Sequence, residues 1–429
     1  MSTTADQRPI APQPAALDTT TVTSWKAPIA LGVFTLLGLA LAVFAPRPGD
    51  TTYRLSLARD VIQLPELVVP TMPALWSVIV LLALATAYSA YLVSRKRRVP
   101  LWLIVVFALL AVFGFLTWAG AGASLPMIGL LFGSLSLAVP LIFGSLAGVI
   151  GERSGVVNIA IEGQLLAGAF TAAVVASVTG QPLLGLVAAM VAGMLVGMVL
   201  AAFAIKYFVD QIIVGVVLNV LVVGLTSFFF SQVLAPNAAI LNTPPRFDRL
   251  PIPILSEIPI IGPVLFRQTL VVYLMYIAVA LVWFGLFKTR WGLRTRAVGE
   301  HPQAADTVGI NVNRTRFWNV ALAGAIAGLG GTFFTIGSGI AFNREMTAGA
   351  GFIALAAVIF GQWDPIKATL AALLFGFASN LQNTLSVIGS PVPSEFMLML
   401  PYVVTIFAVA GFVGKSRAPA ADGKPYIKS

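Results

Sequence analysis

The segment from Gly151 to Gln164, with the sequence GERSGVVNIAIEGQ, places charged and amide side chains between two very apolar stretches. Within it, Asn158 and Glu162 are four residues apart, which puts them on the same side of any helix that runs through both. An ionised side chain at the centre of a bilayer costs roughly 2.5–3.5 kcal/mol, so such residues usually face protein or water. We therefore expect Asn158, Glu162 and Gln164 to line a polar path through the protein.

Asn219 interrupts a long apolar stretch further along the chain and is a second candidate for this path. Both Asn219 and Glu162 also have a structural interpretation. A carboxylate near a helix start is favourable with the helix dipole, so Glu162 is equally compatible with a cap on the helix that follows it. A lone amide such as Asn219 often forms an ordinary hydrogen bond between two membrane helices. The sequence leaves these alternatives open.

The composition predicts a membrane setting for these residues. Of the 429 residues, 58% are hydrophobic and only 10% are charged, whereas a soluble domain has about 25% charged residues. The net charge of +10 fits an excess of Lys and Arg on the inner side of a membrane better than a nucleic-acid-binding surface. The absence of cysteine and the single histidine, His301, argue against a metal site and thiol chemistry. The sequence also lacks a P-loop, so we expect no ATP site of the Walker type.

Twelve apolar segments follow one another and predict an all-α polytopic membrane protein. The two shortest each lie beside Gly-rich polar sequence, a pattern that marks binding sites in transporters. The Gly-Gln-Pro break at 180–182 resembles the break at 361–365, which indicates a faint internal repeat. The segments are 27–45, 72–93, 101–119, 127–150, 164–179, 183–206, 212–234, 268–288, 317–337, 346–361, 364–383 and 394–414.

The distribution of Lys and Arg predicts the orientation. With a cytoplasmic N-terminus and twelve crossings, 19 of the 26 basic residues lie on the inner side and 7 on the outer side. Because inner loops carry the excess of Lys and Arg, we predict that both termini are cytoplasmic. Residues 1–25 are rich in Ala, Pro and Thr, and we expect them to be disordered.

The longest inner loop, residues 289–316, contains a short helix signature. Pro302 suits the first position of a helix, and Gly309 suits a position just after its end. A helix of about seven residues is roughly 10 Å long and is too short to be stable alone in water, so we expect it to dock on a neighbour. The alternative is an ordinary basic loop at the lipid headgroups. For His301, a polar contact with a cytosolic partner is enough to explain a histidine in this loop, and we favour it over a role in proton coupling.

Other polar and small residues have structural interpretations. Asp210 and Asp364 directly precede apolar segments and are predicted helix N-caps. Glu152 and Arg153 are predicted to form a surface or inter-helix ion pair, with direct contact to a solute as the alternative. Glycine pairs at four-residue spacing suit close helix packing, although glycine is common in membrane helices anyway. These pairs are Gly144 and Gly148, Gly193 and Gly197, and Gly324 and Gly328.

Three motifs together resemble the permease subunit of bacterial ABC importers for nucleosides and simple sugars, and more distantly ribose and branched-chain amino-acid permeases. They are GERSGVVNIAIEGQ, then DQIIVGVVLNVLVVGLTSF from Asp210, then WGLRTRAVGEHPQAADTVGINV from Trp291. The resemblance covers about residues 100–414. It implies a ten-helix core with about two extra N-terminal transmembrane helices, and a core helix that is broken near the first motif.

The expected organisation follows from this resemblance. A disordered cytoplasmic N-terminus (1–25) precedes a two-helix extension (26–100). The permease core (101–414) contains the coupling loop (289–316), and a cytoplasmic tail (415–429) completes the chain.

The resemblance also implies the partners. The Glu300–Gly309 helix would couple to a separate ATPase, which would bind ATP and Mg, while this chain would bind no cofactor and catalyse no reaction. A second, different permease and an extracytoplasmic binding protein or lipoprotein would complete the importer in a bacterial plasma membrane. The residues assigned to coupling are Glu300, His301, Pro302, Asp306 and Gly309.

Two other functions are alternatives to an ABC importer permease. An ion-coupled secondary transporter of small polar solutes would need an intramembrane carboxylate that titrates or binds an ion, and Glu162 is the attractive candidate. A membrane-embedded enzyme would need catalytic acids and histidines gathered at one interface, whereas this sequence has one histidine and scattered acids.

Overall fold

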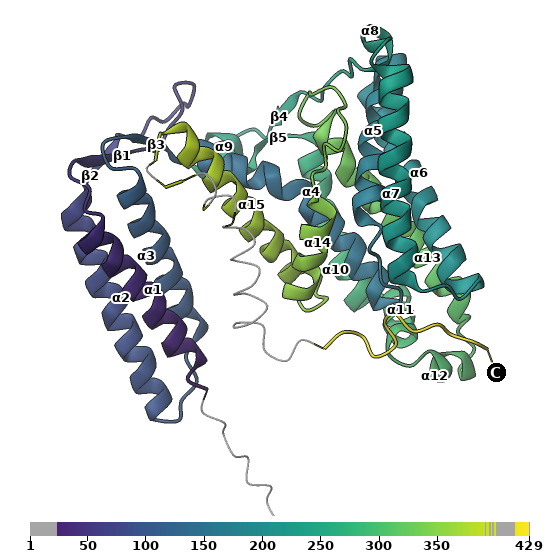
Figure 1. The fold of residues 1–429 in the computed structure, drawn as a ribbon, viewed down its shortest axis with the longest axis horizontal. Coiled ribbons are helices and arrows are strands. Elements are labelled where there is room, and N and C mark those ends of the chain that lie inside the picture. The colour runs from purple at the N-terminus through teal and green to yellow at the C-terminus, as the bar shows by residue number, and fades with distance from the viewer. Residues whose placement is uncertain (1–23, 391, 394–395, 397–398, 400–416, 429) are drawn as a thin grey trace, which may run out of the picture. The chain divides into compact units, whose positions relative to one another are not determined.

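The computed structural model describes residues 24–390, 392–393, 396, 399 and 417–428 (Figure 1). Most of the disorder predicted for residues 1–25, and nearly all of the apolar segment predicted at 394–414, lie outside the described residues. The described chain is mainly helical, with a few short strands in the loops. The predicted all-α membrane architecture is confirmed.

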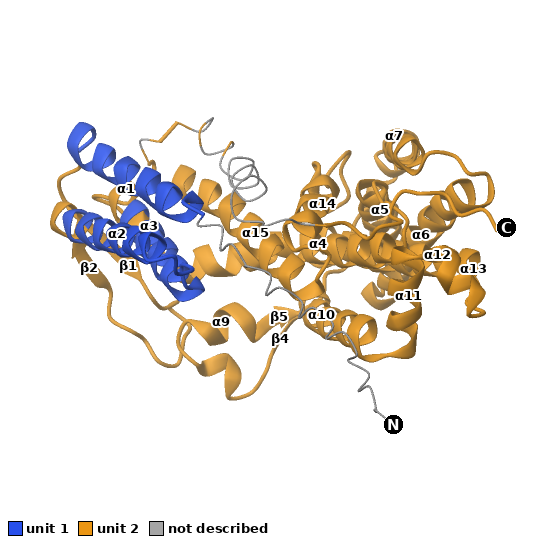
Figure 2. Cartoon of the chain, turned by 90° about the horizontal axis from the view of Figure 1, so that it is seen from below, with its two compact units in different colours: residues 1–46, 75–115 blue, residues 47–74, 116–429 orange. Residues whose placement is uncertain are grey.

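Contacts divide the chain into two compact units (Figure 2). The first contains α1 (Lys26–Phe44) and most of α2 (Thr71–Ser94) and α3 (Leu101–Ala119). Its interior is an apolar cluster that includes Leu31, Val78 and Phe107, and the Thr35 and Thr86 hydroxyls hydrogen-bond between α1 and α2. The predicted domain boundary after residue 100 assigns α3 to the permease core, whereas the contacts group most of α3 with α1 and α2. The boundary of the permease core stays a prediction.

The second unit, residues 47–74 and 116–429, carries two small sheets in the loops between its helices. In the first, β1 (Asp50–Arg54) is central and pairs antiparallel with β2 (Leu67–Pro70) and parallel with β3 (Ser124–Pro126). In the second, β4 (Arg249–Pro251) pairs antiparallel with β5 (Arg267–Thr269).

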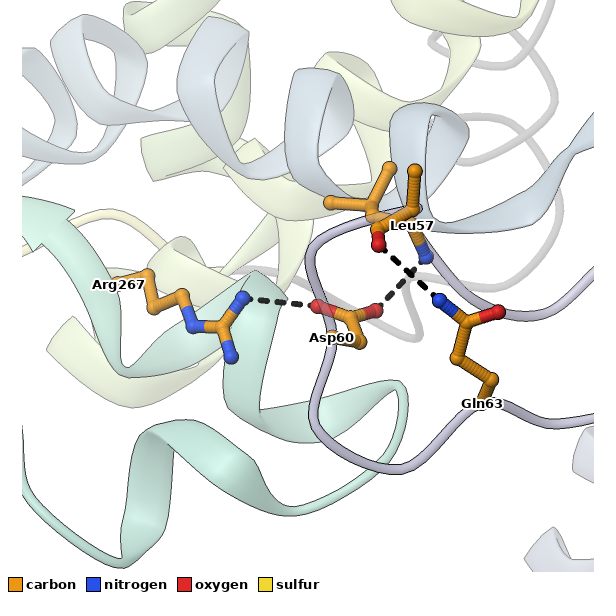
Figure 3. A network of polar contacts seen from close by, with 5 residues as sticks. Leu57, Asp60, Gln63 and Arg267 are labelled. Carbon is orange, nitrogen blue, oxygen red and sulfur yellow. Dashed lines mark hydrogen bonds and ion pairs between the residues drawn. The ribbon is translucent and has the colours of Figure 1, made fainter.

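An ion pair fixes the loop between β1 and β2 to the second sheet (Figure 3). Arg267 Nη1 donates to Asp60 Oδ1 at 2.8 Å, and both side chains are largely buried. The other carboxylate oxygen of Asp60 accepts from the Leu57 amide at 2.7 Å, which closes the loop on itself. A buried charge pair of this kind needs its remaining hydrogen bonds satisfied, and here the backbone supplies one of them.

The long helices of the second unit, together with the short α14, coincide with the remaining predicted apolar segments that the structure describes. The long ones are α4 (Met127–Arg153), α5 (Ile161–Thr179), α6 (Pro182–Ala201) with the π-helical η1 (Ala202–Lys206), α7 (Gln211–Phe229) with the π-helical η2 (Phe230–Leu234), α10 (Leu270–Lys288), α13 (Val312–Gly331) with η4 (Thr332–Phe334), and α15 (Pro365–Val387). The short ones are α8 (Ala238–Leu241), η3 (Leu255–Glu257), α9 (Ile261–Leu265), α11 (Arg290–Glu300), α12 (Pro302–Thr307) and α14 (Ala350–Phe360).

Nine helices within the described ranges are long and apolar enough to cross a membrane, and α14, with 11 residues, is too short to cross alone. In the most apolar window, 61% of α4 and of α5 and 67% of α13 are buried, against 33% for α7. Helices α4, α5 and α13 therefore form the interior of the second unit, and α7 lies at its margin.

Glycines allow the tightest helix contacts in this unit, as their spacing predicts. A Cβ at Gly193 of α6 would overlap the carbonyl oxygen of Gly324 of α13, so these backbones touch directly. On α4, a Cβ at Gly144 would lie 2.7 Å from Ala354 Cβ of α14.

The two predicted N-caps are also confirmed. Asp210 Oδ1 accepts from the Ile212 amide at 2.8 Å at the start of α7. Asp364 Oδ1 accepts from the Ile366 amide at 3.0 Å at the start of α15.

Candidate transport path and coupling surface

The helical path breaks between α4 and α5, within the first of the three motifs. Helix α4 ends at Arg153, α5 begins at Ile161, and the intervening residues form a turn and an extended stretch. Gly155 has φ = +88°, a left-handed conformation that glycine adopts at little cost. Most of this break is buried, as non-helical backbone inside a membrane protein must be.

The break runs along the first two turns of α7. Gln211 Oε1 accepts from the Val157 amide at 2.8 Å, and Asn219 Oδ1 accepts from the Gly163 amide at 2.8 Å. Eight residues separate Gln211 from Asn219, which corresponds to about 12 Å along a helix. Helix α5 therefore begins about 12 Å beyond the start of α7, well inside the helical bundle.

Asn219 holds the first turn of α5 from two sides. Besides accepting from Gly163, its side chain donates through Nδ2 to the Ile159 carbonyl at 2.9 Å. These two groups are backbone atoms that no regular helix satisfies at this break. The geometry fits the open alternative of an interhelical hydrogen bond for Asn219, and this bond lies at the break itself.

Asn158 and Gln164 form a reciprocal amide pair inside the same break. Asn158 Nδ2 donates to Gln164 Oε1 at 3.1 Å, and Gln164 Nε2 donates to Asn158 Oδ1 at 3.2 Å. Both residues are fully buried. In this conformation each amide has its partner within the protein.

Glu162 joins the starts of two helices. It lies in the first turn of α5, and its carboxylate accepts from Thr347 Oγ1 at 2.6 Å, the Gly349 amide at 2.9 Å and the Gly351 amide at 2.6 Å. The last two donors belong to the N-terminus of α14, where a negative charge is favourable. Glu162 thus lies in the first turn of α5, where its charge suits that helix dipole, and its hydrogen bonds cap the start of α14, about 190 residues away.

Glu152 and Arg153, at the end of α4, both bind Trp363 after the end of α14. The Trp363 indole Nε1 donates to the Glu152 carboxylate, and Arg153 Nε donates to the Trp363 carbonyl at 3.0 Å. The surface or inter-helix ion pair predicted for Glu152 and Arg153 is wrong for the part of the chain that the structure describes, because both side chains reach across to the turn between α14 and α15. These contacts could not be predicted from the local sequence, because Trp363 is over 200 residues away.

The loop predicted to couple to a partner contains two helices. Helix α11 ends at Glu300, His301 lies between the helices with φ = −139°, and Pro302 is the first residue of α12. Gly309 follows α12 with φ = +84°. The short helix is six residues long, close to the seven predicted, and it is not a free basic loop.

Helix α12 docks on its own chain through one buried residue, Ala305. Ala305 packs in an apolar cluster with Val298 of α11, Val312 of α13 and Tyr426 of the C-terminal segment. His301 and the α12 residues Gln303, Ala304 and Thr307 are exposed, and Val308 is 75% exposed.

The structure brings the predicted path residues together and places the predicted coupling residues next to the same break. A Cβ at Gly299, near the end of α11, would overlap the carbonyl oxygen of Arg153, so α11 touches the end of α4. Residues that sequence reasoning missed complete both places: Gln211, Thr347, Arg316 and the segment around Tyr426. Of these, Gln211 lies in the second motif and Thr347 lies in the short apolar segment 346–361, which were the usable signals.

The described chain thus combines apolar helices long enough to cross a membrane, a helical path broken between α4 and α5, and a short docked helix between α11 and α13. Residues 130–409 match the family model described as branched-chain amino acid transport system / permease component. The chain belongs to this family and is the permease subunit of an ABC transporter.

Several relatives match over most of their length. The guanosine ABC transporter permease protein NupQ of Bacillus subtilis is 44% identical over 308 residues, which are 69% of this chain and 95% of the relative. The nucleoside ABC transporter permease protein NupC of Lactococcus lactis is 42% identical over the same shares. The putative glucose ABC transporter permease protein TsgC13 of Haloferax volcanii is 36% identical over 59% of this chain and 77% of its own. A second guanosine permease protein of the same Bacillus, NupP, is 26% identical over 294 residues. No solved structure matches the chain.

Proposed function

We propose that this permease subunit moves nucleosides, or related simple sugars, into the cytoplasm, powered by a separate ATPase. The observation that carries the proposal is the buried polar cluster where α5 and α14 begin inside the bundle, formed by the Asn158–Gln164 pair, Glu162 and Asn219. Amide side chains in pairs match the hydroxyls and ring nitrogens of such solutes as donors and acceptors. The names of NupQ and NupC support nucleosides as the first choice, and that of TsgC13 keeps sugars as the second.

In this mechanism the Asn158–Gln164 pair is the inner closure. A solute that enters from the outer side can replace one amide with its own polar groups only if the backbone between α4 and α5 moves. Alternating access would then consist of opening this break toward one side at a time, as in transporters with discontinuous helices. The chain itself makes and breaks no covalent bond.

The driving force would enter through α12. Its exposed face would insert into the ATPase, which binds ATP and Mg, and the contact of α11 with the end of α4 would pass the movement to the break. Glu300, His301, Pro302, Asp306 and Gly309 are the residues assigned to this surface, Pro302 and Gly309 by fixing the ends of the helix.

Partners and orientation follow from the same proposal. The presence of both NupQ and NupP in one organism supports a pair of different permeases, with this chain in the role of NupQ. An extracytoplasmic binding protein or lipoprotein would deliver the solute. The 19 basic residues that a twelve-crossing topology assigns to the inner side, against 7 on the outer side, support a bacterial plasma membrane protein with both termini in the cytoplasm.

The ion-coupled alternative is less well supported by the geometry of Glu162. Its carboxylate has three hydrogen-bond donors within 2.9 Å, two of them backbone amides at a helix start. A carboxylate held in this way is an anchor between two helices, and no ion is needed to balance it.

The decisive experiment is uptake in proteoliposomes that contain the permease pair, the ATPase and the binding protein. We expect uptake of labelled guanosine or another nucleoside to require internal ATP and to continue in the presence of an ionophore. Uptake by the permease alone that stops when the ion gradient is collapsed would overturn the proposal in favour of the ion-coupled transporter.

A further inference from the structure

The C-terminal segment from Ala420 to Tyr426 lies on the ends of α11, α12 and α13 that face the break (Figure 1). We call these residues the C-terminal strap. The strap has almost no regular structure of its own, yet Ala421 and Tyr426 are buried. The strap contacts three parts of the molecule: Arg316 of α13, the helices α11 and α12, and the turn that begins the break between α4 and α5.

The first place is the guanidinium of Arg316, in the first turns of α13. Arg316 is only 2% exposed and is among the largest fully buried side chains of the described chain. Its Nη1 donates to the Lys424 carbonyl at 2.8 Å, and its Nη2 lies 3.5 Å from the Ala421 carbonyl. A buried cation must be neutralised or hydrogen-bonded, and the strap supplies the carbonyl acceptors of both Arg316 Nη atoms.

The second place is the pair of helices α11 and α12. The Ala421 amide donates to the Gly299 carbonyl at 2.9 Å, and the Ala420 amide donates to Glu300 Oε2 at 3.2 Å. At the other end of the strap, the Tyr426 hydroxyl donates to the Asp306 carboxylate, and its ring packs on Ala305. The strap thus contacts the last two residues of α11, which come shortly before α12, and it also contacts α12 itself near its C-terminal end.

The third place is the turn that begins the break. A Cβ at Gly155 would lie 2.6 Å from Arg316 Nη2 and 3.2 Å from the Ala421 carbonyl oxygen. A Cβ at Gly423 would lie 3.4 Å from a methyl group of Val157. The strap therefore touches the two ends of the stretch from Gly155 to Val157, just before the Asn158–Gln164 pair.

We propose that the C-terminal strap is a positioning element that connects α12 to the turn at Gly155–Val157, so that a movement of α12 moves the inner closure of the path. This inference rests on the proposed function, because it assumes that α12 receives the force. Without the strap, α12 would still reach the end of α4 through Gly299, but it would lose its contacts with Arg316 and with the turn itself. Movements of α12 and of the break would then become partly independent.

The test uses Tyr426→Ala in the complete complex, with the neighbouring Ile427→Ala as the matched control, since Ile427 is 70% exposed. Two quantities are measured: the uptake of nucleoside per ATP hydrolysed, and the rate at which a maleimide labels Val157→Cys. This chain contains no cysteine, so the label found on this chain after it is separated from its partners reports Val157→Cys alone.

We expect Tyr426→Ala to lower uptake per ATP by about fivefold or more, the usual lower range for coupling between two sites, while ATP hydrolysis continues. Labelling at Val157→Cys should become faster in the same variant and stay unchanged with Ile427→Ala. Equal uptake per ATP hydrolysed and equal labelling rates in the two variants would overturn the proposal that the strap connects α12 to the turn. A merely structural role of Tyr426 would give a different result. It would lower complex yield, uptake and ATP hydrolysis together and leave the uptake per ATP hydrolysed unchanged.

The two proposals fail in different ways. If the wild-type complex shows no ATP-driven uptake, the proposed function fails, and the labelling rate still decides whether the strap holds the turn. If wild-type uptake is ATP-driven and Tyr426→Ala changes neither quantity, the function stands and the strap is refuted.

Discussion

The Glu162 carboxylate accepts a hydrogen bond from the Gly351 amide at 2.6 Å and so joins the first turn of α5 to the first turn of α14. Both helices begin inside the bundle, and a Cβ at Gly351 would lie 2.9 Å from Glu162 Oε2. Two helix N-termini that meet would repel through their dipoles, and one carboxylate between them offsets this repulsion. The short, Gly-interrupted segments that the sequence pairs with each other are in direct contact through this residue.

Replacement of Glu162 should therefore destabilise the protein by more than the loss of a single hydrogen bond, because three donors share this acceptor. Glu162→Ala leaves three donors without a partner, and each buried unsatisfied group costs about 1–3 kcal/mol. Glu162→Gln keeps an acceptor but loses the charge, at a cost nearer 1 kcal/mol. We expect the thermal midpoint in detergent to fall in the order wild type, Glu162→Gln, Glu162→Ala. The exposed Glu257→Gln is the control, and a midpoint unchanged in Glu162→Ala would contradict the anchor.

The Asn158–Gln164 pair allows stability and transport to be separated. Asn158→Leu leaves the Gln164 amide buried and unpaired, so this variant should lose both stability and uptake. Replacing both partners by apolar groups of similar size is close to neutral for folding, so Asn158→Leu with Gln164→Leu should recover the thermal midpoint. Uptake should stay abolished in the double variant, with the complex still assembled. Wild-type uptake in the stable double variant would show that the pair only packs the interior.

The assignment of α12 to force transfer predicts the behaviour of a charge reversal. Glu300 is exposed at the end of α11, directly before α12, and accepts from the Ala420 amide. We expect Glu300→Lys to leave the complex assembled but to lower the stimulation of the ATPase by solute and binding protein, by about fivefold or more. Glu257→Lys, an exposed reversal in the loop between β4 and β5, is the control. Normal uptake and stimulation in Glu300→Lys would remove Glu300 from the coupling surface.

The strap should dock more weakly as the pH rises. Burial disfavours the charged form of Asp422 and raises the pKa of its carboxyl to about 7 from 3.8, although Arg316 and the Gly423 amide partly oppose the shift. The docked strap thus holds the proton more tightly than the free strap. The stabilisation that protonation gives is complete below pH 4 and is lost as the pH rises toward 7, above which docking is constant.

A spin label at Lys428→Cys measures this docking through its mobility. Mobility should increase between pH 5 and pH 7.5 and change little above that. Asp422→Asn, which keeps the shape of the side chain and cannot titrate, should give low mobility at every pH. A pH response that survives in Asp422→Asn would assign the effect to another group.

Local features of this protein were predictable because their causes are local. Hydropathy marked the membrane helices, Asp210 and Asp364 marked two helix starts, and Pro302 with Gly309 marked α12. The contacts that define the site were not predictable, because each joins residues far apart in sequence. Glu162 gives no sign that its partners lie in α14, and Arg316 resembles any other basic residue of an inner loop. Only the fold shows that Arg316 is buried and that the strap provides its acceptors.

The crossing of α6 and α13 gives a last prediction that concerns stability alone. A Cβ at Gly193 would overlap the Gly324 carbonyl oxygen and would lie 2.7 Å from the Gly328 Cα, so Gly193→Ala must push two helix backbones apart. Overpacking of this kind costs about 1–3 kcal/mol. At Gly224 in α7, a Cβ meets nothing within 4 Å, and Gly224→Ala should be neutral or slightly stabilising because alanine favours the helix. We expect Gly193→Ala to lower the thermal midpoint and Gly224→Ala to leave or raise it. Equal midpoints in the two variants would mean that α6 and α13 do not approach as closely as the glycine pairs imply.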